Sequence, residues 1–133
     1  MAQNSSNQPS IYPVDKEKIK RISAGYGERK KGFHYGIDFA ISEGEKVVST
    51  ADGVIIDAKF DSKRGNYVII QHDGIFSTLY SHLKSISVQV GDKLEKDEVI
   101  GYVGNTGYST GPHLHYEVFK EGKNVNPEDY LPE

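Results

Sequence analysis

The chain has 133 residues, a formal net charge of −3 and no cysteine. Its length predicts one domain that can bury a proper core, and its mildly acidic balance gives no reason to expect binding to nucleic acid or to a membrane surface. No apolar run is long enough to cross a bilayer, and without cysteine any metal would have to be held by histidine and carboxylate.

The N-terminal part of the chain differs in character from the rest. Residues 1–22 are predicted to be a tail and lead-in segment, followed by one domain over residues 23–133. Residues 1–10 are polar, are expected to be disordered and lack the apolar core of a signal peptide. Residues 15–18 predict a short helical turn, and the glycine-punctuated stretch 23–29 predicts a loop.

From His34 onward the sequence favours strands, because short segments rich in Val, Ile, Tyr and Phe alternate with glycine turns. The dipeptide Asp73-Gly74 predicts a two-residue type I′ hairpin turn, and Glu121-Gly122 predicts another hairpin. Strands are expected at residues 47–50, 53–58, 67–72, 75–80, 85–90, 98–103 and 113–119. The predicted fold class is therefore a small, mostly β domain.

A short internal repeat accompanies these strands. Gly44-Glu45-Lys46-Val47 is similar to Gly91-Asp92-Lys93-Leu94, and each is followed by an apolar strand that contains Val-Ile. The repeat indicates a duplicated β core. Alternatively, it reflects turn chemistry that many proteins share.

The sequence His113-Leu114-His115 lies in the last long predicted strand. In a strand, His113, His115, Glu117 and Phe119 share one face. Two imidazoles on one face offer two nitrogen ligands to a metal, or one ligand and one base. A polar strand face explains the same pattern, so this motif alone is a weak signal.

Other histidines strengthen the metal hypothesis. His34 and Asp38 share a face in either a helix or an extended segment. Together with His115 they supply two nitrogens and one oxygen, which leaves the fourth tetrahedral position of Zn²⁺ open to water, as in catalytic zinc sites. His82 follows a predicted strand, where sites are commonly built, and His82 and His113 remain free to handle protons.

Two further residues have competing interpretations. His72 precedes the Asp73-Gly74 turn and is expected to cap local backbone there. Glu117 shares the predicted strand face of His115 and is a candidate acceptor for the second nitrogen of that ring. A solvent-exposed strand glutamate is the alternative for Glu117.

Several motifs resemble the M23 family of zinc metallopeptidases, the lysostaphin/LytM-type peptidoglycan endopeptidases. They are His34-x-x-x-Asp38, Tyr80-Ser81-His82-Leu83, and the run Gly104-Asn105-Thr106-Gly107-Tyr108-Ser109-Thr110-Gly111-Pro112-His113-Leu114-His115-Tyr116-Glu117. The stretch Ser23–Arg29 and the ending Val125-Asn126-Pro127-x-x-Tyr130-Leu131 are also similar to the family. The resemblance thus covers the chain from about Ser23 to Leu131.

The resemblance implies one Zn²⁺ per chain, with His34, Asp38 and His115 as ligands and His82 and His113 as the catalytic pair. It also implies an antiparallel β-sheet or β-sandwich domain, similar to a duplicated hybrid motif, with a substrate groove. The implied activity is hydrolysis of peptide bonds in peptidoglycan stem peptides or crosslinks by metal-activated water. Whether a glycine bridge or a D-amino-acid crosslink is cleaved stays open.

The loop over residues 101–111 is predicted to form one wall of that groove. Asn105, Thr106 and Tyr108 are candidate substrate-binding residues, with service in turn geometry as the alternative. The resemblance adds Tyr26 as a candidate, because it lies near the place where some family members have a tyrosine that helps stabilise the intermediate. Because family members work outside the cytoplasm, we expect an extracytoplasmic monomer that acts on peptidoglycan. No export signal is recognisable, so we expect the chain to be part of a longer exported protein.

Two other functions remain as alternatives. Some relatives have lost the metal ligands and serve as binding or activating modules for other cell-wall hydrolases, but no ligand position is substituted here. The pattern Gly91-Asp92-Lys93-Leu94-x-x-x-x-Val99-Ile100-Gly101 also occurs in lipoyl-like and phosphocarrier domains. A carrier domain gives no reason for the collected histidines.

Overall fold

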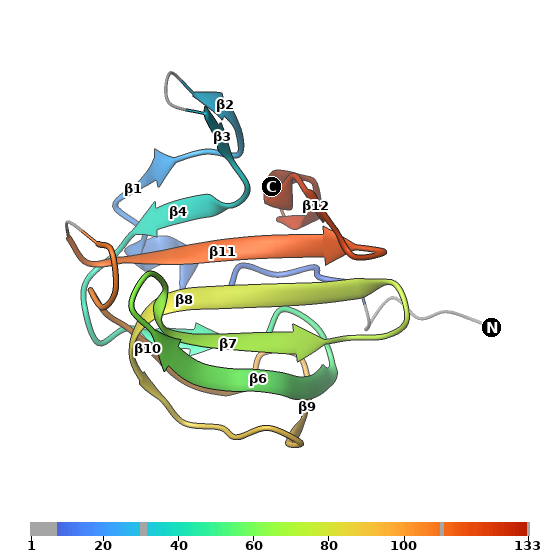
Figure 1. Ribbon diagram of the computed structural model, residues 1–133. Coiled ribbons are helices and arrows are strands. Elements are labelled where there is room, and N and C mark those ends of the chain that lie inside the picture. Colours follow the sequence, from blue (N-terminus) through green and yellow to red (C-terminus); the bar gives the residue numbers. More distant parts are fainter. Residues whose placement is uncertain (1–7, 30–31, 110, 133) are drawn as a thin grey trace.

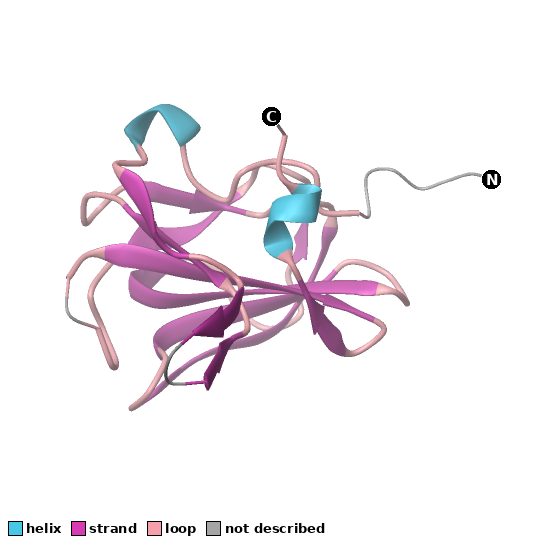
Figure 2. Ribbon diagram, turned by 90° about the horizontal axis from the view of Figure 1, so that it is seen from above, coloured by secondary structure: helices cyan, strands magenta, loops and turns pink. Residues whose placement is uncertain are grey.

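The computed structural model describes residues 8–29, 32–109 and 111–132 (Figure 1). Strands make up most of this part of the chain, and its helices are single 3-10 turns (Figure 2). The strands are β1 (Arg21–Ala24), β2 (Gly27–Arg29), β3 (Gly32–His34), β4 (Ile37–Ala40), β5 (Lys46–Val48), β6 (Gly53–Asp61), β7 (Gly65–Gln71), β8 (Phe76–Ile86), β9 (Lys93–Leu94), β10 (Val99–Val103), β11 (His113–Lys120) and β12 (Lys123–Val125). The 3-10 turns are η2 (Lys16–Lys18) and η3 (Pro127–Tyr130).

The strands form a 10-stranded antiparallel sheet in the order β1-β4-β11-β8-β7-β6-β9. β10 pairs with β5 and β8, β12 pairs with β11, and β2 and β3 form a separate hairpin. The predicted mostly β antiparallel fold is confirmed. No helix of the described residues is long and apolar enough to cross a membrane.

Strand β11 places the sequence motif His113–Glu117 at the centre of the sheet, between β4 and β8. Its alternate residues Leu114, Tyr116 and Val118 are fully buried in the core. Burying an aliphatic or aromatic side chain of this size contributes about 1.5–3 kcal/mol. The predicted alternation is confirmed, and it leaves His113 and every second residue after it on the opposite face.

Two expectations about strand boundaries are wrong. The sequence predicts separate strands at 75–80 and 85–90, but one strand, β8, runs from Phe76 to Ile86, because Ser81 and His82 form an irregularity within the sheet and not a break. Residues 87–90 lie outside the strands. The predicted loop at 23–29 contains the end of β1 and all of β2, because β1 pairs with β4 and β2 pairs with β3.

The two predicted hairpin turns have different outcomes. Glu121 and Gly122 connect β11 and β12 with positive φ angles of 53° and 80°, as a two-residue type I′ turn requires. Asp73-Gly74 does not form such a turn, because neither residue has a positive φ and the loop between β7 and β8 is longer. Instead, the Asp73 side chain accepts hydrogen bonds from the amides of Ile75 and Phe76.

The glycines of the internal repeat adopt the same conformation, since Gly44 and Gly91 have φ angles of 95° and 97°. Each amide donates to a carbonyl of a neighbouring segment, that of Val103 for Gly44 and that of Ile55 for Gly91. The repeat therefore has equivalent local structure in its two copies.

The lead-in segment packs against the sheet. Asp15 caps η2, which confirms the predicted helical turn, and Val14 is 3% exposed in the core. Pro9 is buried and the Ser10 amide donates to Thr50, so these residues are ordered, whereas the rest of the predicted tail, residues 1–7, lies outside the described residues. The domain boundary at residue 22 stays a prediction.

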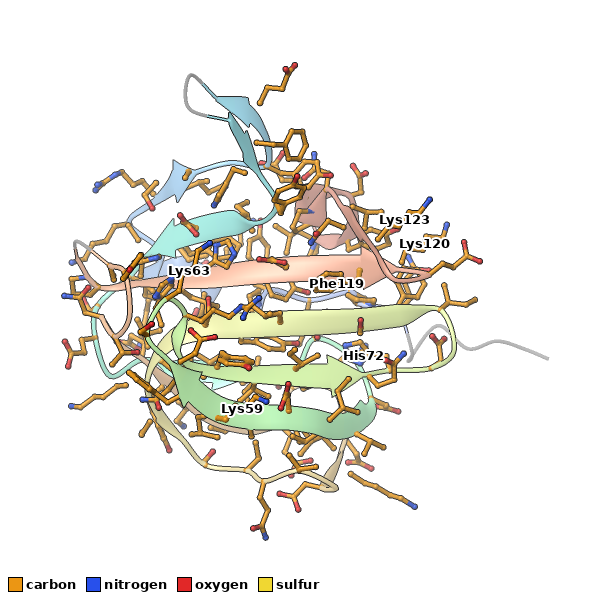
Figure 3. All side chains as sticks on the ribbon, viewed as in Figure 1. Lys59, Lys63, His72, Phe119, Lys120 and Lys123 are labelled. Carbon is orange, nitrogen blue, oxygen red and sulfur yellow. The ribbon has the colours of Figure 1, made fainter. Side chains whose placement is uncertain are left out.

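His72 is buried directly after the end of β7 (Figure 3). Its Nδ1 lies 2.7 Å from the carbonyl oxygen of Asp52, and its Nε2 lies 2.8 Å from Oγ1 of Thr78. Nδ1 is therefore the donor and Nε2 the acceptor. The expectation that His72 caps local backbone is wrong, because its backbone partner belongs to another segment.

A buried hydrogen-bonded chain continues from Thr78. Its Oγ1 lies 2.7 Å from the Tyr80 hydroxyl, which lies 3.1 Å from Oγ1 of Thr50. That oxygen lies 2.8 Å from the Tyr116 hydroxyl. Because an unpaired polar group in such a core costs about 1–3 kcal/mol, this chain fixes the side chains beneath β8 and β11.

Candidate metal centre

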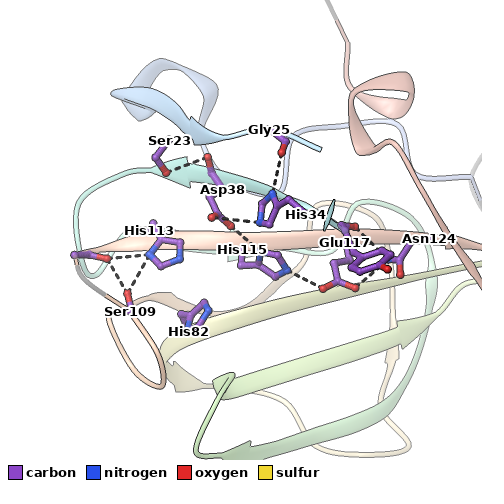
Figure 4. Close-up of polar contacts among 12 residues, drawn as sticks. Ser23, Gly25, His34, Asp38, His82, Ser109, His113, His115, Glu117 and Asn124 are labelled. Atoms are coloured by element: carbon purple, nitrogen blue, oxygen red, sulfur yellow. Dashed lines mark hydrogen bonds and ion pairs between the residues drawn. The ribbon is translucent and has the colours of Figure 1, made fainter. Parts of the chain in front are cut away.

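Three neighbouring strands carry a row of polar side chains on the face opposite the core. In the register of β4, β11 and β8, His115 lies opposite Asp38 on one side and opposite Ser81 on the other. Residues directly opposite one another in an antiparallel pair point to the same face of the sheet. His34 joins them from the end of β3, just before the turn that leads into β4 (Figure 4).

His34, Asp38 and His115 converge as the sequence predicts. One possible ligand atom from each residue lies within 4.8 Å of the other two. Nδ1 of His115 is 2.6 Å from Oδ1 of Asp38, and Nε2 of His34 is 3.5 Å from Oδ2. The three side chains are largely shielded from solvent.

Hydrogen bonds outside the cluster determine which atoms face it. Nδ1 of His34 lies 2.9 Å from the Gly25 carbonyl oxygen and is assigned as the donor to it. Nε2 of His115 lies 2.7 Å from Oε2 of Glu117 and donates to that carboxylate. Nε2 of His34, Nδ1 of His115 and the Asp38 carboxylate are thus left as lone-pair donors aimed at one point, which suits a divalent cation such as Zn²⁺.

The carboxylates compensate electrostatically for the buried imidazole. Burial lowers the pKa of His115, but hydrogen bonds from its ring to Asp38 and Glu117 outweigh this effect and raise that pKa to about 9. Conversely, burial raises the pKa of Asp38, but the hydrogen bond and the charge of His115 bring it below its usual value. The cluster therefore favours positive charge between its carboxylates, either as a proton on Nδ1 of His115 or as a cation that takes the place of this proton.

His82 reaches the same face through a β-bulge. Asn66 lies opposite Leu83 and Val68 opposite Tyr80, so β8 contains one residue more than β7 over this stretch. His82 has a φ of 64°, which a non-glycine residue rarely adopts. Simple alternation would place His82 with Tyr80 in the core, and the bulge turns it toward the cluster instead.

His82 and His113 form a second pair beside the cluster, with ring centroids 4.8 Å apart. Nδ1 of His82 donates to the Thr106 carbonyl oxygen at 2.6 Å, and Nδ1 of His113 donates to the Gly111 carbonyl oxygen at 2.9 Å. Both rings therefore keep an Nε2 that can accept a proton. Burial, reinforced by the neighbouring imidazoles, lowers the pKa of His82, so this ring is neutral near pH 7.

The histidines line a groove of about 630 Å³ over this face of the sheet. Tyr108 is 76% exposed at its edge. The Thr106 hydroxyl donates to the Leu83 carbonyl and its own carbonyl holds His82, so this residue positions the catalytic candidate. Asn105 is exposed outside the groove lining.

Tyr26 packs its ring against Phe33 and lies beside the Asn124 carbonyl, outside the groove lining. Substrate contact by Tyr26, Asn105, Thr106 and Tyr108 stays a prediction.

Three features of the site were not found from the sequence or were left open there. Glu117 bonds to His115 and is not a solvent-exposed strand residue. Asn124 donates to Glu117 from β12, and no motif singled it out. The Ser81 hydroxyl is buried in the groove floor without a hydrogen-bond partner among the described residues.

This antiparallel β domain with its histidine and aspartate cluster has the architecture of a metallopeptidase. The model of peptidase family M23 matches residues 32–127, and the chain belongs to that family. The membership confirms the resemblance seen in the sequence and sets aside the carrier-domain alternative.

Individual relatives agree with this assignment. The chain is 52% identical to an uncharacterized metalloprotease of Buchnera aphidicola subsp. Baizongia pistaciae over 76% of its own length and 27% of that protein. It is 41% identical to the peptidoglycan DD-endopeptidase ShyA of Vibrio cholerae, over 86% of this chain and 28% of ShyA. The chain thus spans about a quarter of the length of these relatives.

Among solved structures, the chain is similar to a zinc-containing peptidase from Vibrio cholerae. The TM-score is 0.82 and the sequence identity 36%, over 90% of this chain and 39% of the other.

Proposed function

We propose that this chain is a zinc-dependent endopeptidase that hydrolyses peptide bonds in peptidoglycan stem peptides or crosslinks. The observation that carries the proposal is the convergence of His34, Asp38 and His115 within 4.8 Å on the floor of a groove. Membership in peptidase family M23 and the similarity to a peptidoglycan DD-endopeptidase support it.

In this proposal His34, Asp38 and His115 hold one Zn²⁺ per chain. The bound ion would supply a water of lowered pKa, near 7, and would polarise the scissile carbonyl. Asp38 provides a hard oxygen ligand and negative charge, and the imidazoles of His34 and His115 provide neutral nitrogens.

His82 and His113 handle protons beside this centre. Each has its Nδ1 hydrogen anchored on a backbone carbonyl, so each presents Nε2 to the groove. A neutral imidazole accepts a proton there, and the resulting imidazolium returns it to the leaving amine. The pair also provides hydrogen-bond donors, once protonated, for the charge that develops on the substrate oxygen.

The location of the protein follows from its proposed substrate. Peptidoglycan lies outside the cytoplasm, so we propose that the protein acts in the cell envelope or as a secreted enzyme. A monomer is sufficient for this activity, because the four histidines and the one aspartate of the proposed site all come from one chain.

The test is release of soluble peptides from purified crosslinked peptidoglycan, analysed by mass spectrometry. We expect release to stop with a chelator and to return with Zn²⁺. His113→Ala should bind zinc like the parent protein but lower the rate about 10²–10⁴-fold. A parent protein that binds zinc and releases no peptide would instead support the non-catalytic binding module, and unchanged zinc binding in Asp38→Ala would refute the ligand set.

A further inference from the structure

The side chain of Asn124, on β12, lies at the end of the groove beside Glu117 (Figure 4). Its Nδ2 donates to Oε1 of Glu117 at 3.0 Å and to the carbonyl oxygen of Tyr35 at 3.2 Å. Both hydrogens of the amide are therefore used, each by a different segment of the chain.

These two acceptors belong to the segments that carry the metal-ligand candidates. Tyr35 lies in the turn between His34 and Asp38. Glu117 uses its other oxygen, Oε2, to accept from Nε2 of His115 at 2.7 Å. The Asn124 amide thus connects the turn between His34 and Asp38 to the Glu117 carboxylate, which orients the His115 ring.

The turn and β11 leave no spare room between them. A Cβ atom on Gly36 would lie 2.5 Å from the Tyr116 carbonyl oxygen, 2.8 Å from Cγ of Glu117 and 2.8 Å from Cε1 of His115. The turn therefore rests directly on the imidazole and on the glutamate side chain. A change in the distance between this turn and β11 would displace the His115 ring.

We propose that Asn124 is a positioning residue of the metal centre, which holds the His34–Asp38 turn and the Glu117–His115 pair at the separation that metal binding needs. The inference rests on the proposed function in that it takes these residues as zinc ligands. In this role Asn124 is not itself a ligand of the ion. It acts through Glu117, whose carboxylate sets the orientation of the His115 ring.

The amide is required because both partners are acceptors. An aspartate at this position has nearly the same shape but, when ionised, no hydrogen to donate. Asn124→Asp therefore places a carboxylate against Glu117 and the Tyr35 carbonyl, whereas Asn124→Ala only removes the two bonds. We expect the aspartate to displace Glu117 more than the alanine does.

Asn126 provides a matched control on the same segment. Its Oδ1 accepts from the amide of Glu128 and caps η3, so Asn126→Ala also removes a side-chain hydrogen bond. That bond lies outside the ligand segments. A purely structural loss should therefore lower the melting temperature in Asn126→Ala and leave zinc affinity unchanged.

The experiment measures zinc affinity by chelator competition in the parent protein, Asn124→Ala, Asn124→Asp and Asn126→Ala. We expect about 10-fold to 100-fold weaker binding in the two Asn124 variants, with the larger loss for aspartate. Thermal unfolding of each variant shows that it is folded. Asn124→Ser, which is too short to span both partners, replaces any variant that fails to fold.

A second readout does not depend on bound metal. In the zinc-free parent, NMR should show a His115 Nε2 hydrogen protected from exchange by its bond to Glu117, and the Asn124 variants should lose this protection. Zinc affinity and protection equal to the parent in folded Asn124 variants would overturn the inference. Failure of the parent itself to bind zinc would refute the proposed function, and the NMR comparison would still decide the role of Asn124.

Discussion

At the scale of single residues, Ser81 stands out because its side chain carries a buried polar atom without a hydrogen bond within the described part of the chain. It is 1% exposed, and its hydroxyl has no partner among the described residues. Removing a buried hydroxyl that makes no bond removes only its desolvation penalty. We therefore expect Ser81→Ala to leave the free energy of unfolding unchanged or to raise it by about 1 kcal/mol, measured by urea unfolding.

The control for this prediction is Ser49, which is fully buried and donates to the Ala51 carbonyl. Ser49→Ala should cost about 1 kcal/mol or more, because it removes a buried hydrogen bond. A loss in Ser81→Ala as large as that in Ser49→Ala would mean that the Ser81 hydroxyl has a partner in the folded protein.

His72 predicts a pH dependence of stability. Burial lowers its folded-state pKa below the ordinary value of 6.5, although a hydrogen bond to Asp52 opposes the shift. The unfolded chain therefore binds the proton more readily, and the stability that His72 contributes is present above pH 6.5 and lost as the pH falls toward the lowered folded-state pKa.

Between pH 7 and pH 5 the parent protein should lose more stability, or gain less, than His72→Gln, as measured by unfolding midpoints. Glutamine keeps a donor and an acceptor without a group that titrates in this range. An equally steep dependence in His72→Gln would show that another group carries the proton.

At the scale of elements, the hairpin between β11 and β12 holds a residue in an unfavourable conformation. Glu121 has a φ of 53° and precedes Gly122 in the turn. Asparagine tolerates this left-handed region better than glutamate and is preferred before glycine in type I′ turns. We expect Glu121→Asn to raise the free energy of unfolding by about 0.5–1 kcal/mol, because it relieves part of the left-handed penalty.

Chemical denaturation measures this gain, and Asp129→Asn on η3 serves as a charge-matched control. If Glu121→Asn raises the free energy of unfolding no more than that control does, the residue type at position 121 does not limit the stability of the turn.

Elements also show which parts of the fold the sequence could predict. The alternation in β11 and the Glu121-Gly122 turn depend on local backbone chemistry, and both are visible in the residues themselves. The bulge at His82 and the partner of Asn124 depend on contacts between distant segments. The periodicity of a sequence does not indicate such contacts. For this reason the sequence predicts neither the bulge that turns His82 toward the cluster nor the role of Asn124.

At the scale of the whole molecule, the candidate metal centre joins residues from near the two ends of the domain sequence. His34 and Asp38 precede most of the sheet, while His115 follows it, and the Asp38–His115 contact spans 77 positions. A preformed site of this kind does not exist in an unfolded chain, so an ion that binds it stabilises the folded state.

We therefore expect zinc to raise the melting temperature, with a gain of about 4 kcal/mol when free zinc is 1,000 times the dissociation constant. Asp38→Ala should fold and lose this gain, because it removes the proposed oxygen ligand that lies between the two imidazoles. Asp61→Ala is the control, since Asp61 lines the same groove but pairs with Arg64. Calorimetry with and without zinc distinguishes these outcomes, and an undiminished zinc effect in Asp38→Ala would place the ion elsewhere.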